Sequence, residues 1–164
     1  GLGGEAPVTI EQVTALLGIR HGETQSDWCD AVLKDEPGRA AAMIPKLLDQ
    51  AGVSGVGLLI QLGTHLIGLG VARAHHDRGQ RGGGLQSAVF NSILKVRPAG
   101  RLDYKGSAAK WSAVVEAWPR RRIDAAISAA LLADRRFKST TLADERGTLV
   151  DLVMQLAHRA REAA

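Results

Sequence analysis

The residues best suited to chemistry in this sequence form one short string, Arg20-His21-Gly22-Glu23-Thr24. Phosphoryl transfer through a histidine needs a nucleophilic imidazole, a guanidinium that neutralises phosphate oxygens, and further cationic or acidic groups around them. The string supplies these residue types next to one another. A phosphoryl-transfer enzyme is therefore one hypothesis for this chain.

The string resembles the R-H-G-E-T signature of the histidine phosphatase and phosphoglycerate mutase superfamily, in which the histidine accepts the phosphoryl group. In that superfamily the signature follows a buried strand of an α/β sheet. Here it follows residues 9–17, where Thr9 and Gln12 form a predicted capping box and the apolar residues have helical spacing. Phosphoryl transfer is accordingly kept as an alternative to the function favoured below.

Histidines elsewhere could bind a metal, but their spacing favours structural roles. His75, His76 and Asp77 are adjacent, and adjacent side chains on a helix point about 100° apart and share one ion poorly. We expect them to form the polar end of a helix. His65 lies in an apolar helix, where a buried histidine with a hydrogen-bond partner is the expected arrangement. The sequence predicts no metal site.

The glycine-rich segment Gly82-Gly83-Gly84 is interpreted as part of a loop over residues 78–84. A loop before a helix can bind anions, but the G-x-x-x-x-G-K-[ST] and G-x-G-x-x-G patterns of nucleotide sites are both missing from the sequence. The sequence accordingly assigns no catalytic, cofactor-binding or metal-binding residue, and no cofactor.

The apolar residues recur at helical spacing along nearly the whole chain, without a long alternation of period two. This predicts an all-α fold, a bundle of about seven to eight helices. The first covers residues 9–17, the second begins at Ser26 or Asp27 and ends near residue 35, and the third begins at Pro37 and ends at Gly52. Pro45 predicts a kink in the third helix, or a start nearer residue 42.

The second half of the chain continues the helical pattern. The predicted elements are a helix capped by Ser54 and ending near His76, one over 85–96, one capped by Ser107 and reaching Trp118, and two over 123–137 and 149–157. Asp134 and Lys138 form an i, i+4 pair within the penultimate helix. Trp111 and Trp118, seven residues apart, predict core packing on one helix face.

One stretch, residues 55–72, carries no formal charge and is long enough to suggest a membrane span. Five glycines and a central His65 favour a buried core helix instead. We therefore predict no membrane association.

The composition fits one soluble domain with a piece of another: 164 residues, 17.4 kDa, 45% apolar and a net charge of +4. Six aromatic residues are too few for a base-stacking platform. The single cysteine, Cys29, excludes an internal disulfide and a site made of several thiolates. Residues 1–5 show neither the basic start nor the apolar core of a secretory leader. Together with the single cysteine, this predicts a cytoplasmic protein.

Charge is distributed unevenly along the chain. Residues 1–50 hold four cationic and eight anionic side chains, a net −4, so residues 51–164 carry +8. The densest part, 95–122, has two acids, Asp103 and Glu116, and eight cations: Lys95, Arg97, Arg101, Lys105, Lys110, Arg120, Arg121 and Arg122. This segment is either a solvated face or a contact for phosphates or an acidic partner, so a stand-alone basic DNA-binding module is a second alternative.

Several short motifs, in order, resemble the C-terminal part of the delta subunits of bacterial DNA polymerase III clamp loaders. The similar segments are residues 8–18, Trp28 to Asp35, Ala40 to Leu48, the pair Trp111-Ser112 after Lys110, and Ala133-Asp134-Arg135-Arg136-Phe137-Lys138-Ser139. The resemblance covers about residues 7–160. Pro45, the glycines of 55–70 and the R-H-G-E-T string depart from that family's usual pattern.

The resemblance implies that residues 1–24 end an AAA+ lid region and that residues 25–164 form a helical collar, an oligomerisation domain. It implies a non-catalytic part of the DNA polymerase holoenzyme, a nucleotidyltransferase complex used in DNA replication. The implied partners are the loader ATPase subunits (gamma/tau) and delta-prime. The sliding clamp would be met through an N-terminal domain that this sequence lacks, so the chain would be a fragment. DNA contact is possible through 95–122.

Overall fold

The computed structural model describes residues 23–97, 102–139 and 144–162, and their regular structure is entirely helical. The elements are α2 (Gln25–Leu33), α3 (Pro37–Leu48), α4 (Gly55–Asp77), α5 (Gly82–Val96), α6 (Tyr104–Val114), the 3₁₀ helix η1 (Val115–Ala117), α7 (Arg120–Ser139) and α8 (Glu145–Glu162). The predicted all-α bundle is confirmed. The helix expected over residues 9–17 lies outside the described residues.

The helix starts follow from side chains that cap backbone N–H groups. Ser54 caps α4 as predicted, since its Oγ accepts from the N–H of Gly57 at 3.1 Å. The predicted caps of α2 were wrong: Thr24 is the N-cap, and Asp27 is its capping-box partner, with bonds of 3.1 and 2.8 Å between them.

The predicted cap of α6, Ser107, was also wrong. The helix begins one turn earlier, because Asp103 accepts from the N–H of Gly106 at 3.0 Å, and Ser107 is buried inside the helix. The helix is also shorter than expected: it ends at Val114, and η1 separates it from Trp118.

Tertiary packing overrides local breakers at two places. Helix α3 starts at Pro37 and runs through Pro45, so the alternative start near residue 42 was wrong; its buried stripe of Ala40, Met43, Ile44 and Leu47 outweighs the one backbone bond that the proline removes. Gly82–Gly84 form the first turn of α5, not a loop, because Leu85 and Val89 anchor that helix in the core.

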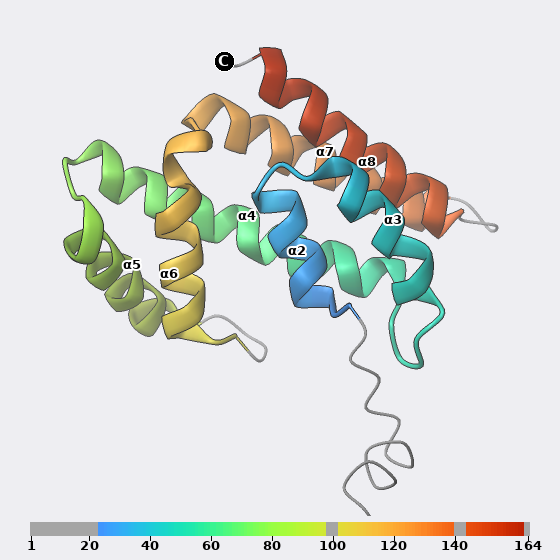
Figure 1. Ribbon diagram of the computed structural model, residues 1–164, viewed down its shortest axis with the longest axis horizontal. Coiled ribbons are helices and arrows are strands. Elements are labelled where there is room, and N and C mark those ends of the chain that lie inside the picture. Colours follow the sequence, from blue (N-terminus) through green and yellow to red (C-terminus); the bar gives the residue numbers. More distant parts are fainter. Residues whose placement is uncertain (1–22, 98–101, 140–143, 163–164) are drawn as a thin grey trace, which may run out of the picture.

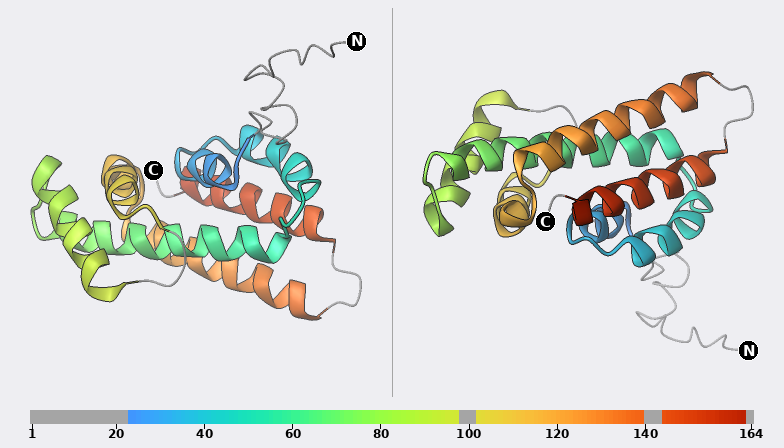
Figure 2. Two further views of the ribbon diagram at one scale, coloured as in Figure 1. Left: turned by 90° about the horizontal axis from the view of Figure 1, so that it is seen from below. Right: turned by 90° about the horizontal axis from the view of Figure 1, so that it is seen from above.

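Helix α4 is the central element, and the other helices pack around it in two regions (Figure 1). In the first region, α2, α3, α7 and α8 form a bundle with α4, in which α3 and α7 both contact α8. In the second region, α5 and α6 pack on each other and on the later part of α4. Figure 2 shows α7 running alongside α4, with α5 and α6 gathered at one end of the molecule.

The core is continuous between the two regions. Trp28, Met43, Leu62, Leu69 and Trp118 are among its fully buried side chains. Trp111 is 2% exposed, so the prediction that Trp111 and Trp118 belong to the core is confirmed. The prediction that they share one helix face was wrong, because α6 ends at Val114 and Trp118 follows η1.

Candidate functional site

The described part of the R-H-G-E-T string serves the start of α2. Thr24 caps the helix, and the Glu23 carboxylate lies 3.3 Å from the Lys46 ammonium of α3. The Glu23 carbonyl accepts a bond from the Gln50 side chain at 3.1 Å. Arg20, His21 and Gly22 lie outside the described residues. Glu23 and Thr24, the two residues of the string that the structure describes, therefore have structural roles.

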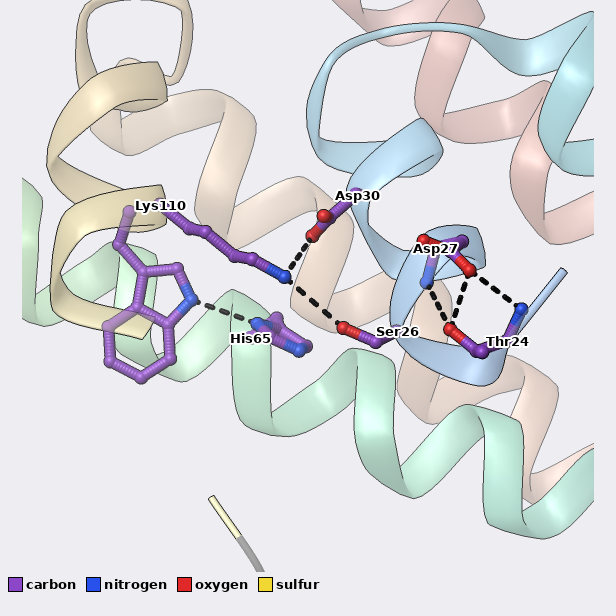
Figure 3. A network of polar contacts seen from close by, with 7 residues as sticks. Thr24, Ser26, Asp27, Asp30, His65 and Lys110 are labelled. Atoms are coloured by element: carbon purple, nitrogen blue, oxygen red, sulfur yellow. Dashed lines mark hydrogen bonds and ion pairs between the residues drawn. The ribbon is translucent and has the colours of Figure 1, made fainter. Parts of the chain in front are cut away.

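A polar network joins α6 to α2 above the central helix (Figure 3). The Lys110 ammonium lies 2.9 Å from the Asp30 carboxylate and donates to the Ser26 hydroxyl at 3.2 Å. Because Asp30 is mostly buried and Lys110 about half-buried, this ion pair is less screened than a surface pair. Its role is to dock the two helices.

His65 of α4 is buried, and its partner is Trp111 of α6. The indole Nε1 donates to His65 Nδ1 at 2.9 Å, and the two rings meet edge to face with 5.9 Å between their centroids. Burial, with a smaller contribution from the Lys110 charge, lowers the pKa of His65 below its usual 6.5. The ring is therefore neutral at pH 7, with its proton on Nε2. The prediction of a buried histidine with a hydrogen-bond partner is confirmed.

Gly68 explains how close the indole of Trp111 comes to α4. A Cβ placed on Gly68 would overlap the six-membered ring of that indole. Glycine is thus required here for the approach of α6 to α4, in contrast to Gly63 on the same helix, where a Cβ would meet nothing within 4 Å.

His75 and His76 form the polar C-terminal end of α4, as predicted, and have separate partners. His75 Nε2 lies 2.8 Å from the Ser92 hydroxyl of α5, while the buried His76 ring lies 3.8 Å from the exposed Glu116 carboxylate. Within the described residues, no three potential ligands gather around a common point.

The predicted basic segment, 95–122, divides into structural and exposed cations. Lys110 pairs with Asp30. Arg122, in the first turn of α7, is buried and pairs with Asp35 after the end of α2. The exposed cations are Lys95, Arg97, Lys105, Arg120 and Arg121, and Arg101 lies outside the described residues. Two of the eight cations of the segment are therefore engaged in the structure, and five are exposed.

Arg122 and Trp118 close the junction between the end of α2 and the start of α7. The Arg122 guanidinium lies 3.8 Å above the Trp118 ring, donates to the Ala117 carbonyl at 2.8 Å and pairs with Asp35 at 3.0 Å. Trp118 Nε1 donates to the Leu33 carbonyl at 2.9 Å. Burial lowers the pKa of Arg122, against the opposing effect of Asp35.

The exposed side of α4 is apolar. We define the α4 apolar face as Val56, Ile60, Ile67 and Val71, which lie on one side of the helix. Ile60 and Ile67 are 65% and 64% exposed, and no residue from 55 to 72 is charged. On α7, Ile127 and Leu131 are also exposed, and Ile127 lines a second cavity together with Ile67. Charged residues line that cavity as well: Arg73, Asp77, Arg120 and Asp124.

An open cavity of about 280 Å³ adjoins this face where α4, α5 and α6 meet. We call it the α4–α6 groove. Its lining is largely apolar: Thr64, Ile67, Gly68, Val71, Ser92, Ile93, Val96, Leu102 and Trp111. The groove and the α4 apolar face together are the candidate functional site, and their chemistry is that of binding an apolar partner.

The sequence indicates the uncharged helix but not which side of it is exposed, because core and surface residues share one helical period. The run of 18 uncharged residues was the available signal. Helix α4 is the one helix of the described residues long and apolar enough to cross a membrane, and half of its apolar window is buried.

Comparison with protein-family models, with curated proteins and with solved structures finds no match to this chain.

Proposed function

We propose that this chain is the C-terminal assembly part of a DNA polymerase III clamp-loader delta subunit. It binds the loader ATPase subunits and delta-prime through a helical collar, and it has no catalytic activity of its own. The observation that carries the proposal is the α4 apolar face, an uncharged stripe exposed on the central helix of an all-helical bundle. The ordered motifs of residues 7–160 supply the choice of family.

The exposed apolar residues provide binding energy of the right kind. Full burial of an isoleucine side chain stabilises by about 1.5–3 kcal/mol, so burying the exposed two thirds of Ile60 or Ile67 contributes about 1–2 kcal/mol each. Large, apolar interfaces are typical of permanent assemblies, in which each subunit presents surface that resembles a core cut in half.

The alternatives have less support. For a DNA-binding module, two of the eight cations of residues 95–122 are already engaged, since Lys110 and Arg122 are held in ion pairs with Asp30 and Asp35. For phosphoryl transfer, Thr24 already caps α2 and Glu23 already pairs with Lys46 of α3, so the two described residues of the R-H-G-E-T string have structural partners.

The test is size-exclusion chromatography with light scattering, on this chain mixed with the loader ATPase and delta-prime subunits of the same organism. A shared peak of defined stoichiometry is expected. Separate peaks, with partners that do bind a full-length delta subunit, would contradict the proposal.

A further inference from the structure

The α5–α6 pair is attached to the rest of the molecule mainly through α4. The two helices pack on each other and on the later part of α4, and α6 also contacts η1. Figure 2 shows the pair at one end of the molecule, away from the bundle that α2, α3, α7 and α8 form with α4. Separation of the pair from α4 would leave the contacts within that bundle intact.

Two histidines of α4 form hydrogen bonds to this pair, and the two bonds have different requirements. His65 Nδ1 accepts from the indole N–H of Trp111 at 2.9 Å, and an indole nitrogen can only donate. His75 Nε2 lies 2.8 Å from the Ser92 hydroxyl, which gives its one hydrogen to the Ala88 carbonyl at 3.0 Å and therefore accepts from His75. The first bond requires a neutral histidine, whereas a protonated histidine can still form the second.

Protonation of His65 would place two N–H donors against each other. The hydrogen added to Nδ1 would point at the indole N–H of Trp111, and the buried indole would lose its acceptor. The indole packs so closely on Gly68 that even a Cβ there would overlap it, so the contact has little room to rearrange. The conflict ends when α6 moves away from α4 and both groups reach water.

The charges around His65 also favour its neutral form while α6 is docked. Lys110 of α6 disfavours a proton on the ring, and Asp30 of α2 has the smaller, opposite effect (Figure 3). Among the described residues, α5, η1, α7 and α8 pack on α4 without adding a charge that acts on this ring. Burial and Lys110 thus hold the pKa of docked His65 below 6.5, the usual value to which exposure to water returns it.

We infer that protonation of His65 releases the α5–α6 pair from α4, so that this region of the protein responds to acid by opening. The pair is docked above pH 6.5. Below it, the ratio of released to docked protein rises by up to about tenfold per pH unit, until the pH reaches the pKa of the docked form. Release separates Lys110 from Asp30 and removes Trp111 from α4. The inference concerns contacts within the chain, so it does not depend on the proposed function.

The experiment is hydrogen exchange of the chain alone at pH 7.5 and 5.5, expressed as protection factors so that the intrinsic pH dependence of amide exchange cancels. The most protected amides of α7 and α8 report global unfolding, and we expect the amides of α5 and α6 to be at least about tenfold less protected. Their protection should fall by about three- to tenfold between the two pH values, tenfold being the limit for a histidine whose pKa is 6.5 when released.

Two matched variants assign the response to one histidine. His65→Asn keeps an oxygen that can accept from Trp111 but does not titrate, so the protection of α6 should change by less than about twofold with pH. His75→Asn, the same substitution on the same helix, should retain the response of the wild-type chain. Each variant is compared with itself at the two pH values, so a uniform loss of stability does not affect the result.

Trp111→Phe removes the opposing donor and keeps an aromatic ring. Neutral His65 then gains no bond from α6, so the response to pH should be smaller than in the wild-type chain. An equal response in this variant overturns the hydrogen bond as the contact that senses acid. A full response in His65→Asn overturns the role of His65. Equal protection of α6 and of the most protected amides of α7 and α8 at pH 5.5 overturns the separate release of the pair.

Discussion

Trp111 and Trp118 lie seven residues apart, and their surroundings distinguish the two regions of the molecule. Trp118 is fully buried at the junction of α2 and α7, with its indole N–H bonded to a backbone carbonyl and its ring covered by Arg122. Trp111 is bonded to a side chain, His65, and its ring borders the open α4–α6 groove. The first tryptophan closes a junction, and the second lines a cavity that is open to solvent.

Burial alone does not separate a side chain enclosed in the core from one that lines a cavity open to solvent. Both indoles are at most 2% exposed, yet one of them borders a cavity open to solvent. Substitutions at Trp118 should therefore affect stability alone. Changes beside Trp111 should affect both stability and partner binding.

The largest expected effect is that of Trp118→Ala. Removing a buried tryptophan costs about 3–5 kcal/mol of unfolding free energy, and here the Leu33 carbonyl and Arg122 also lose their partner. Urea unfolding measures the loss. Trp118→Phe, which keeps an aromatic ring but not the donor, should cost about 1–3 kcal/mol. Equal losses of unfolding free energy for Trp118→Ala and Trp118→Phe would contradict a separate contribution of the ring to stability.

Gly68→Ala tests the close packing of Trp111 on α4. The new Cβ overlaps the indole of Trp111, so α6 must move away from α4, at a cost of about 1–3 kcal/mol. Gly63→Ala is the matched control, because its Cβ meets nothing within 4 Å and a helical alanine stabilises by about 1 kcal/mol relative to glycine. Opposite signs in urea unfolding are expected, and stabilisation by both variants would contradict the close packing at Gly68.

The smallest expected effect is the pH dependence due to His65. Because burial lowers the pKa of folded His65 below 6.5, the unfolded chain binds the proton first as the pH falls. Stability is therefore highest above pH 6.5 and decreases below it, by at most about 1.4 kcal/mol per pH unit. His65→Asn, which offers Trp111 an oxygen acceptor, should weaken this dependence between pH 7.5 and 5.5. An unaltered profile would assign the dependence to other groups.

Much of the fold could be predicted from the sequence because helical period and capping residues are local signals. Ser54 before the uncharged stretch and the apolar stripes of α7 and α8 located those helices correctly. The errors came where several residues could cap, as at Thr24 and Asp103, and where tertiary packing maintained a helix through Pro45 or from Gly82.

The candidate site was less predictable because its parts are distant in the sequence. His65 was expected to have a partner, but the pairing with Trp111, 46 residues further on, is a property of the fold. The same is true of Lys110 with Asp30 and of Arg122 with Asp35. In the sequence these residues are only members of a basic or acidic segment, and their pairing changes what that segment can bind.

The most direct test of the central claim is the reactivity of a thiol on the α4 apolar face. Cys29 is fully buried, and burial raises the pKa of its thiol to about 12, so Ile67→Cys adds the one reactive thiol expected in the described part of the chain. Alkylation of this variant is followed by intact mass, with and without the loader subunits, beside Leu132→Cys as control. We predict that the subunits protect the thiol at position 67 and leave the thiol at position 132 as reactive as before. Equal alkylation at position 67 in the free and the bound chain would contradict the account.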